Sequence, residues 1–174
     1  MLILAISGSL RTASYNSAVL RAAAQVVPDV HLFEGLGELP LFNPDRDTEP
    51  GTAVERWRAA VAAADALLIA SPEYAHGISG PMKNALDWLV SMPDFPGKPV
   101  ALWNTSPRAH HAQDALREVL TTMSAELVDL ACATIPLPGT GLDTPGILAR
   151  PDLVRLIGDS LASLRHAAML RRGQ

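Results

Sequence analysis

Short apolar runs alternate with helical patterns along the whole chain, and this alternation restricts the fold more than any other feature. Runs that are apolar on both faces are typical of strands buried in a parallel sheet, whose connections are helices. We therefore predict an α/β fold with helices on both faces of the sheet. The predicted strands are Leu2–Ile6, Val30–Phe33, Ala66–Ala70, Pro99–Asn104 and Leu127–Ile135. The predicted helices are Asn16–Val27, Thr52–Ala64, Gly80–Ser91, Ala112–Ser124 and Pro151–Leu170.

The topology of such a sheet is limited by the right-handedness of its crossovers. For five strands this favours the flavodoxin-like order 2-1-3-4-5. A chain of 174 residues has the length of one domain with a sizeable core. We expect a single flavodoxin-like domain over residues 1–174: a three-layer sandwich with a five-stranded parallel sheet of order 2-1-3-4-5. Ligands of such sheets bind beyond the carboxyl ends of the strands, here the loops after Ile6, Ala70 and Asn104.

Composition excludes several classes of partner. Apolar residues make up 48% of the chain, which is typical of a folded domain, and the net charge of -4 argues against nucleic acid or anionic membranes as partners. No apolar run approaches the roughly 18 residues of a membrane helix, and no basic region precedes the first apolar run. The single cysteine, Cys132, rules out an intramolecular disulfide. These features predict a cytoplasmic protein.

The first loop has the form of an anion cradle. The strand Leu2–Ile6 opens into Ser7–Ser17, which is rich in hydroxyls and leads directly into a helix. Backbone N–H groups and the positive end of the helix dipole both favour an anion there. With one glycine and no Gly-Lys-Ser/Thr, the loop matches neither the dinucleotide fingerprint nor a Walker loop, so a monophosphate fits best. Ser14 or Asn16 could instead act only as the N-cap. The candidate anion ligands are Ser9, Arg11, Ser14 and Asn16.

The second loop, residues 71–80, is typical of a wall for a flat ligand. Glu73 and Tyr74 are predicted to lie on a stiff turn, with Gly77 and Gly80 allowing the backbone to approach a ring. Pro81 then follows the preference of proline for the first turn of a helix. No second His, Cys or carboxylate stands at metal-ligand spacing, so we predict no metal, and the histidine of this loop is expected near a ligand rather than in catalysis.

These two loops together resemble the NADPH-dependent FMN reductase family of flavodoxin-like proteins, which includes bacterial quinone, chromate and azo-dye reductases. The family carries Gly-Ser-x-Arg-x-x-Ser-x-Asn, matched by Gly8–Asn16, and Pro-Glu-Tyr-Asn, matched at three of four positions by Pro72–Ala75. Its Pro-x-x-Lys-Asn-Ala-x-Asp-Trp is matched by Pro81–Trp88 with one residue fewer between Pro and Lys, and Glu38–Asn43 is similar to its second crossover loop. The resemblance covers most of residues 1–105.

The resemblance implies which residues hold a flavin. The FMN phosphate would be held by Ser9, Arg11, Ser14 and Asn16. The isoalloxazine would lie along Pro72, Glu73, Tyr74, His76 and Gly77, with Ser106 from the Ser-Pro pair of the third loop. Lys83, Asn84 and Trp88 match the motif too, but a structural role is favoured for them.

The implied activity is that of an FMN-dependent NAD(P)H oxidoreductase, which passes a hydride through bound flavin to a quinone or similar small acceptor. Its cofactors would be FMN and NAD(P)H, and no catalytic side chain is predicted because the flavin supplies the chemistry. The family also implies a homodimer or homotetramer.

Two departures from the family pattern keep an alternative open. Position 75 is Ala where the family has Asn, and the third loop, Asn104–His111, contains no glycine where the family has a Gly-rich turn. Arg108 could therefore begin a surface helix or contact the substrate. The alternative is a flavodoxin-like binding or regulatory protein with weak or no flavin binding. The Pro-rich segment 36–50 could likewise be a simple connection, or could wall the site or contact a second subunit.

Overall fold

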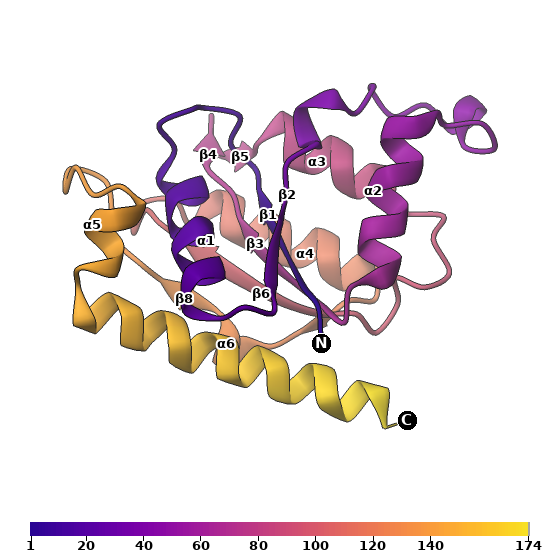
Figure 1. Ribbon diagram of the computed structural model, residues 1–174. Coiled ribbons are helices and arrows are strands. Elements are labelled where there is room, and N and C mark those ends of the chain that lie inside the picture. Colours follow the sequence, from indigo (N-terminus) through magenta and orange to yellow (C-terminus); the bar gives the residue numbers. More distant parts are fainter. Residues whose placement is uncertain (174) are drawn as a thin grey trace.

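A parallel sheet lies between two layers of helices in the computed structural model, which describes residues 1–173 (Figure 1). The strands run in the order β2-β1-β3-β6-β7, with β8 also paired to β6, and every pair in this sheet is parallel. The predicted order 2-1-3-4-5 is confirmed. The strands are β1 (Ile3–Ser7), β2 (Val30–Phe33), β3 (Ala66–Ala70), β6 (Pro99–Asn104), β7 (Glu126–Leu127) and β8 (Ala133–Thr134).

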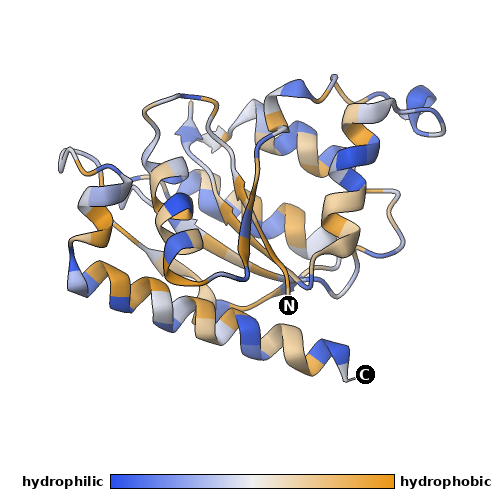
Figure 2. Ribbon diagram, in the orientation of Figure 1, coloured by the Kyte–Doolittle hydropathy of each residue, from blue (hydrophilic) through white to orange (hydrophobic). Residues whose placement is uncertain are grey.

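Each face of the sheet has its own apolar core. Successive side chains of a strand point to opposite faces. Ile3 and Ala5 of β1 pack on one side, while Leu4 and Ile6 pack on the other. Figure 2 shows the result: the central strands are hydrophobic, whereas hydrophilic residues gather on the helices around them. The first core is covered by α1 (Tyr15–Val26), α5 (Thr144–Leu148) and α6 (Pro151–Arg172), and the second by α2 (Thr52–Ala63), α3 (Gly80–Asp87) and α4 (His111–Thr122).

Most of the predicted helices are confirmed to within a few residues. Helix α3 falls short of its predicted length by more residues than the others do. It ends at Asp87 rather than at Ser91. The short helix α5 has no counterpart among the predictions. Among the helices of residues 1–173, none is both long enough and apolar enough to cross a membrane.

The predicted fifth strand, Leu127–Ile135, is wrong as a continuous element. Its place beside β6 is shared by β7 and β8, and the 3-10 helix Asp129–Ala131 separates them. The Ala131 carbonyl turns inward and accepts from the Trp103 indole N–H at 3.2 Å and from Ser160 Oγ at 2.6 Å. These two hydrogen bonds hold the 3-10 helix away from the strand pairing with β6. The apolar character of the run gives no sign of this break.

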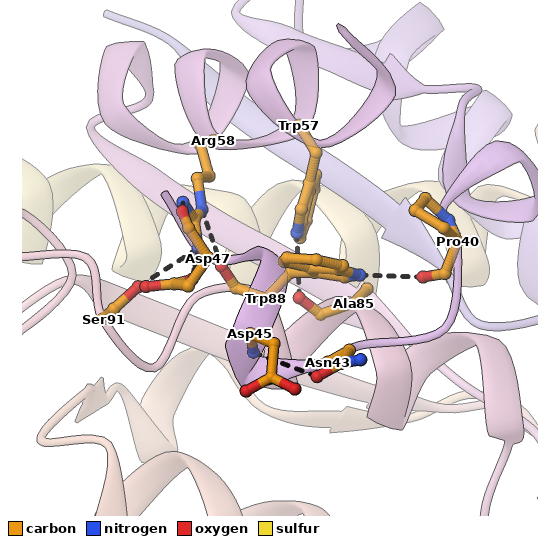
Figure 3. A network of polar contacts seen from close by, with 9 residues as sticks. All are labelled: Pro40, Asn43, Asp45, Asp47, Trp57, Arg58, Ala85, Trp88 and Ser91. Carbon is orange, nitrogen blue, oxygen red and sulfur yellow. Dashed lines mark hydrogen bonds and ion pairs between the residues drawn. The ribbon is translucent and has the colours of Figure 1, made fainter. Parts of the chain in front are cut away.

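The segment 36–50 contains two 3-10 helices, Leu36–Glu38 and Pro44–Arg46. It is fastened to α3 by three hydrogen bonds. The Asn84 amide donates to the Pro40 carbonyl at 2.9 Å and accepts from Phe42 N at 2.8 Å. The Trp88 indole donates to the same Pro40 carbonyl at 2.8 Å (Figure 3). Asn84 and Trp88 therefore have the structural contacts predicted for them.

Arg58 of α2 makes the second fastening of this segment (Figure 3). Its guanidinium donates to the Trp88 carbonyl at 2.8 Å and forms an ion pair with Asp47. Ser91 Oγ adds a hydrogen bond to Asp47 Oδ1 at 3.1 Å. The hydrogen bonds from Arg58 and then Ser91 hold the pKa of the Asp47 carboxyl below its ordinary value.

Acid should release this fastening. Because the pKa of Asp47 is lowered on folding, its contribution to stability is present above the ordinary carboxyl pKa of about 3.9 and is lost as the pH falls through the folded value. We expect Asp47→Asn to lower the free energy of unfolding at pH 7 by up to about 1 kcal/mol and to lose less stability than wild type towards pH 3. Urea unfolding at both pH values measures this.

Ser91→Ala is the matched control, because it removes one hydrogen bond to Asp47 and leaves the ion pair with Arg58 in place. Because the bond from Ser91 is the second and smaller cause of the lowered pKa of Asp47, this variant should keep most, but not all, of the wild-type dependence on acid. An Asp47→Asn variant that loses as much stability as wild type between pH 7 and pH 3 would contradict this account.

Candidate functional site

A cavity of about 300 Å³ lies at the carboxyl edge of the sheet, where the loops after β1, β3 and β6 meet. The β1–α1 loop and the β4–β5 hairpin lie beside each other at the upper edge of Figure 1. The predicted residues that line the cavity are Ser9, Arg11, Ser14, Asn16, Pro72, Glu73, Tyr74 and Ser106. Residues not in that prediction complete the wall: Tyr15, Ser71, Asn104, Thr105, Arg108, Ala109 and Pro138. The predicted residues His76 and Gly77 do not line it.

The first loop ends as the N-terminus of α1. Ser14 is the N-cap and accepts from Ser17 N at 3.3 Å. The first N–H groups of a helix have no intrahelical acceptor, and the first turn of α1 contains no acidic residue. Asn16 is buried, and its Oδ1 accepts from Thr105 Oγ1 at 3.0 Å, which ties this loop to the third. The loop is thus preformed and suited to an anion.

Gly8 lets the first loop approach the second. Its N–H donates to the Ala70 carbonyl at 2.9 Å, and its carbonyl accepts from Ser79 Oγ at 2.7 Å. A Cβ at this position would lie 2.3 Å from Ser71 Oγ, a distance that real Cβ atoms do not adopt. Glycine is therefore required where the two loops touch.

The second loop is a small hairpin of β4 (Glu73–Tyr74) and β5 (Gly77–Ile78). Its two turn residues, Ala75 and His76, have φ values of 49° and 58°. Positive φ at both central residues is the pattern of a type I′ turn, which favours Asn-Gly and is strained for Ala. The left-handed positions of this loop are therefore Ala75 and His76, whereas Gly77 and Gly80, predicted to let the backbone approach a ring, do not have positive φ.

The Glu73 carboxylate joins this hairpin to α4. Its Oε2 accepts from Ala112 N at 2.9 Å, in the first turn of α4. The residue at the N-cap position, His110, makes no capping hydrogen bond of its own. The His76 ring stacks on His111, with centroids 4.3 Å apart and planes at 22°. Glu73 and His76 thus act at the joint between the hairpin and α4, and His76 does so outside the cavity.

The cavity wall is positively charged. Arg11 and Arg108 both line it, and Glu73 is the single carboxylate on the wall, already bonded to a helix N–H group. Within residues 1–173 neither arginine forms an ion pair with a carboxylate. In the same part of the chain, no group of three or more His, Cys, Asp or Glu is placed to hold a metal ion.

Pro138 lines the cavity, although no residue of its loop was among the predicted site residues. It follows β8, so the fourth carboxyl end of the sheet also contributes to the wall. The cluster Pro136-Leu137-Pro138-Gly139 after the last apolar run is a turn signal that could have placed this loop at the site.

Known proteins are similar to this chain in sequence and in structure. Residues 1–137 match the NADPH-dependent FMN reductase family. An NAD(P)H-dependent FMN reductase of Pseudomonas aeruginosa is 36% identical over 181 residues, which cover 98% of this chain and 97% of that protein. A quinone reductase of Escherichia coli is 31% identical over 137 residues, 73% of each chain. Among solved structures, a flavoenzyme NAD(P)H:(acceptor) oxidoreductase of Paracoccus denitrificans has a TM-score of 0.82 and 26% identity, covering 95% of this chain and 96% of its own.

The cap that Glu73 supplies to α4 can be tested directly. Glu73→Ala removes the acceptor for Ala112 N and should cost about 1 kcal/mol of stability, the usual value for a lost N-cap. Glu73→Gln keeps an acceptor oxygen and should keep most of that stability. Amide hydrogen exchange at Ala112 should rise in the Ala variant and stay near wild type in the Gln variant; unchanged exchange in both would show that Glu73 does not cap the helix.

Proposed function

The chain belongs to the NADPH-dependent FMN reductase family, and we propose that it is an FMN-dependent NAD(P)H oxidoreductase that reduces a quinone or similar small acceptor. The observation that carries the proposal is one cavity in which a basic anion cradle continues into a slot walled by the β4–β5 hairpin. FMN has the same two parts, a phosphate and a flat ring.

The phosphate end of the cavity fits a monophosphate. Arg11 offers a guanidinium fork that suits phosphate oxygens, and Ser9 and Ser14 add hydroxyls beside the N-terminus of α1. Asn16 is committed through its Oδ1 to Thr105, so only its amide donors are available to a ligand. We propose that Ser9, Arg11, Ser14 and Asn16 hold the FMN phosphate.

The ring end of the cavity is formed by Pro72, Glu73 and Tyr74 on one side and by Ser106 on the other. The Glu73 carboxylate is engaged with α4, which leaves the hairpin backbone to face the ring. We propose that these residues orient the isoalloxazine, while His76 and Gly77 act through the shape of the hairpin rather than by contact.

FMN, when bound, would supply the redox chemistry, by which NAD(P)H and one proton from solvent reduce a quinone to the hydroquinone and leave NAD(P)+. The protein's part is to bind and orient both reactants against the ring. The exposed side of Tyr74 and the Arg108 guanidinium border the open part of the cavity, where a second molecule would enter. Because donor and acceptor would use the same opening, ping-pong kinetics follow.

We also propose that the protein is a cytoplasmic homodimer or homotetramer. Leu41 and Val90, which adjoin the contact between the segment 36–50 and α3, have 83% and 65% of their surface exposed and would be covered by a second subunit. Dependence on NAD(P)H and the free thiol of Cys132 both favour a reducing compartment.

The absorbance spectrum of the purified protein tests the proposed activity. After incubation with FMN and removal of the excess, we expect a retained yellow flavin that bleaches with NADPH and recovers when a quinone is added. A protein that never retains flavin would contradict the proposal and favour the binding or regulatory alternative.

The placement of the phosphate is tested by Arg11→Ala. Loss of a charged hydrogen bond should weaken FMN binding by about 2 kcal/mol, or roughly 30-fold, as measured by fluorescence titration. Arg155→Ala, which removes an exposed charge from α6, is the matched control and should bind FMN like wild type. Equal affinities for FMN in the two variants would place the phosphate elsewhere.

A further inference from the structure

A second cavity lies next to the first loop, Ser7–Ser17. Its volume is about 360 Å³, and it separates the N-terminal half of α1 from the segment 141–144 that leads into α5. It shares Arg11, Ser14 and Tyr15 with the first cavity, so the two are neighbours across one wall. The remaining lining residues are Thr12, Ala13, Ala18, Arg21, Gly141, Leu142, Asp143 and Thr144.

The second cavity is basic. Ser14, Ala18 and Arg21 recur at positions i, i+4 and i+7, so they share one face of α1, and this face forms the wall. Arg11 adds a second guanidinium. Within residues 1–173 Arg21 forms no ion pair, and the one carboxylate on the wall, Asp143, already accepts from Gly146 N at 2.9 Å as the N-cap of α5.

The opposite wall is held in place by hydrogen bonds. Thr144 Oγ1 donates to the Ala18 carbonyl at 3.2 Å, which fixes the start of α5 against α1. Thr140 Oγ1 donates to the Leu137 carbonyl at 2.6 Å and accepts from Leu142 N at 3.2 Å. The cavity is therefore built by the fold and does not depend on a ligand to form it.

The lining has two kinds of surface. Ala13, Ala18, Leu142 and the body of Tyr15 offer an apolar surface, while Arg21 offers a free cation. An apolar slot with a few placed polar groups is typical of a small-molecule site. The ligand that matches both surfaces is a planar base with a phosphate attached, that is, a phosphorylated nucleoside.

We propose that the second cavity binds the adenosine 2′-phosphate end of NADPH and that Arg21 determines the preference for NADPH over NADH. This inference rests on the proposed function, which places the nicotinamide in the first cavity. A dinucleotide is long and has an aromatic group at each end, and the two cavities adjoin at the three residues that line both, Arg11, Ser14 and Tyr15. The 2′-phosphate is the group that NADH lacks, and Arg21 is the one cation that α1 contributes to the second cavity.

Steady-state kinetics of the FMN-loaded enzyme with a quinone acceptor give the first test. Arg21→Gln should raise KM for NADPH roughly 10-fold to 100-fold, the effect of losing a charged hydrogen bond, and should leave KM for NADH and kcat unchanged. Arg21→Lys keeps the charge and should restore much of the preference. Arg155→Gln, the same change on an exposed arginine of α6, should have no effect.

Equilibrium binding gives a second test that needs no turnover. Adenosine 2′,5′-bisphosphate should bind wild type more tightly than adenosine 5′-monophosphate in calorimetric titrations, and the difference should vanish in Arg21→Gln. Equal weakening of NADPH and NADH in Arg21→Gln, or equal binding of the two nucleotides to wild type, would overturn the inference. Failure of both dinucleotides to reduce the bound flavin of wild type would instead contradict the proposed function, and the nucleotide titration would still decide whether the second cavity reads a 2′-phosphate.

Discussion

The contact at Gly8 is the constraint on which the rest of the site depends. β1 and β3 are adjacent parallel strands, so their carboxyl ends leave the sheet side by side. Gly8 turns this proximity into contact, because its carbonyl accepts from Ser79 Oγ and no Cβ separates it from Ser71. The Gly8 carbonyl is thereby bonded to the second loop and the Gly8 N–H to the end of β3, so that the arginine-bearing cradle and the hairpin are held together without a ligand.

Two further hydrogen bonds connect the three loops to one another. The Glu73 carboxylate fixes the hairpin to α4, and the Thr105 hydroxyl fixes the third loop to Asn16 of the first. Each loop thus contacts both others, directly or through the start of α4. A site with walls in place before binding loses less conformational entropy when a ligand enters. The polar residues of the family motifs therefore hold the loops in position as well as line the cavity.

The sequence predicts those elements that depend on the pattern of neighbouring residues along the chain. β1, β3 and β6 are continuous apolar runs, and the handedness of the crossovers then gives their order. The break in the fifth strand, by contrast, depends on where the Ala131 carbonyl finds its donors, Trp103 and Ser160, both distant in sequence. Lys98 is similar: it is buried because its Nζ reaches the Val61 and Ala64 carbonyls at the end of α2, and no periodicity signals this. The place of the first loop on the cavity wall is predictable because strand, loop and helix are consecutive, whereas the contacts of Glu73 and His76 are made with α4, which is distant along the chain.

The glycine-free third loop forms its turn through side-chain hydrogen bonds. Asn104 Oδ1 accepts from Ser106 N at 2.9 Å, an Asx turn, and its amide donates to the Ala109 carbonyl at 3.0 Å. One side chain therefore supplies the turn that glycine would allow through its backbone. The loop closes on itself rather than into the cavity, and Ser106 and Arg108 remain on the wall. The lack of glycine in the sequence is consequently no sign of a blocked site, because side-chain hydrogen bonds produce the required turn.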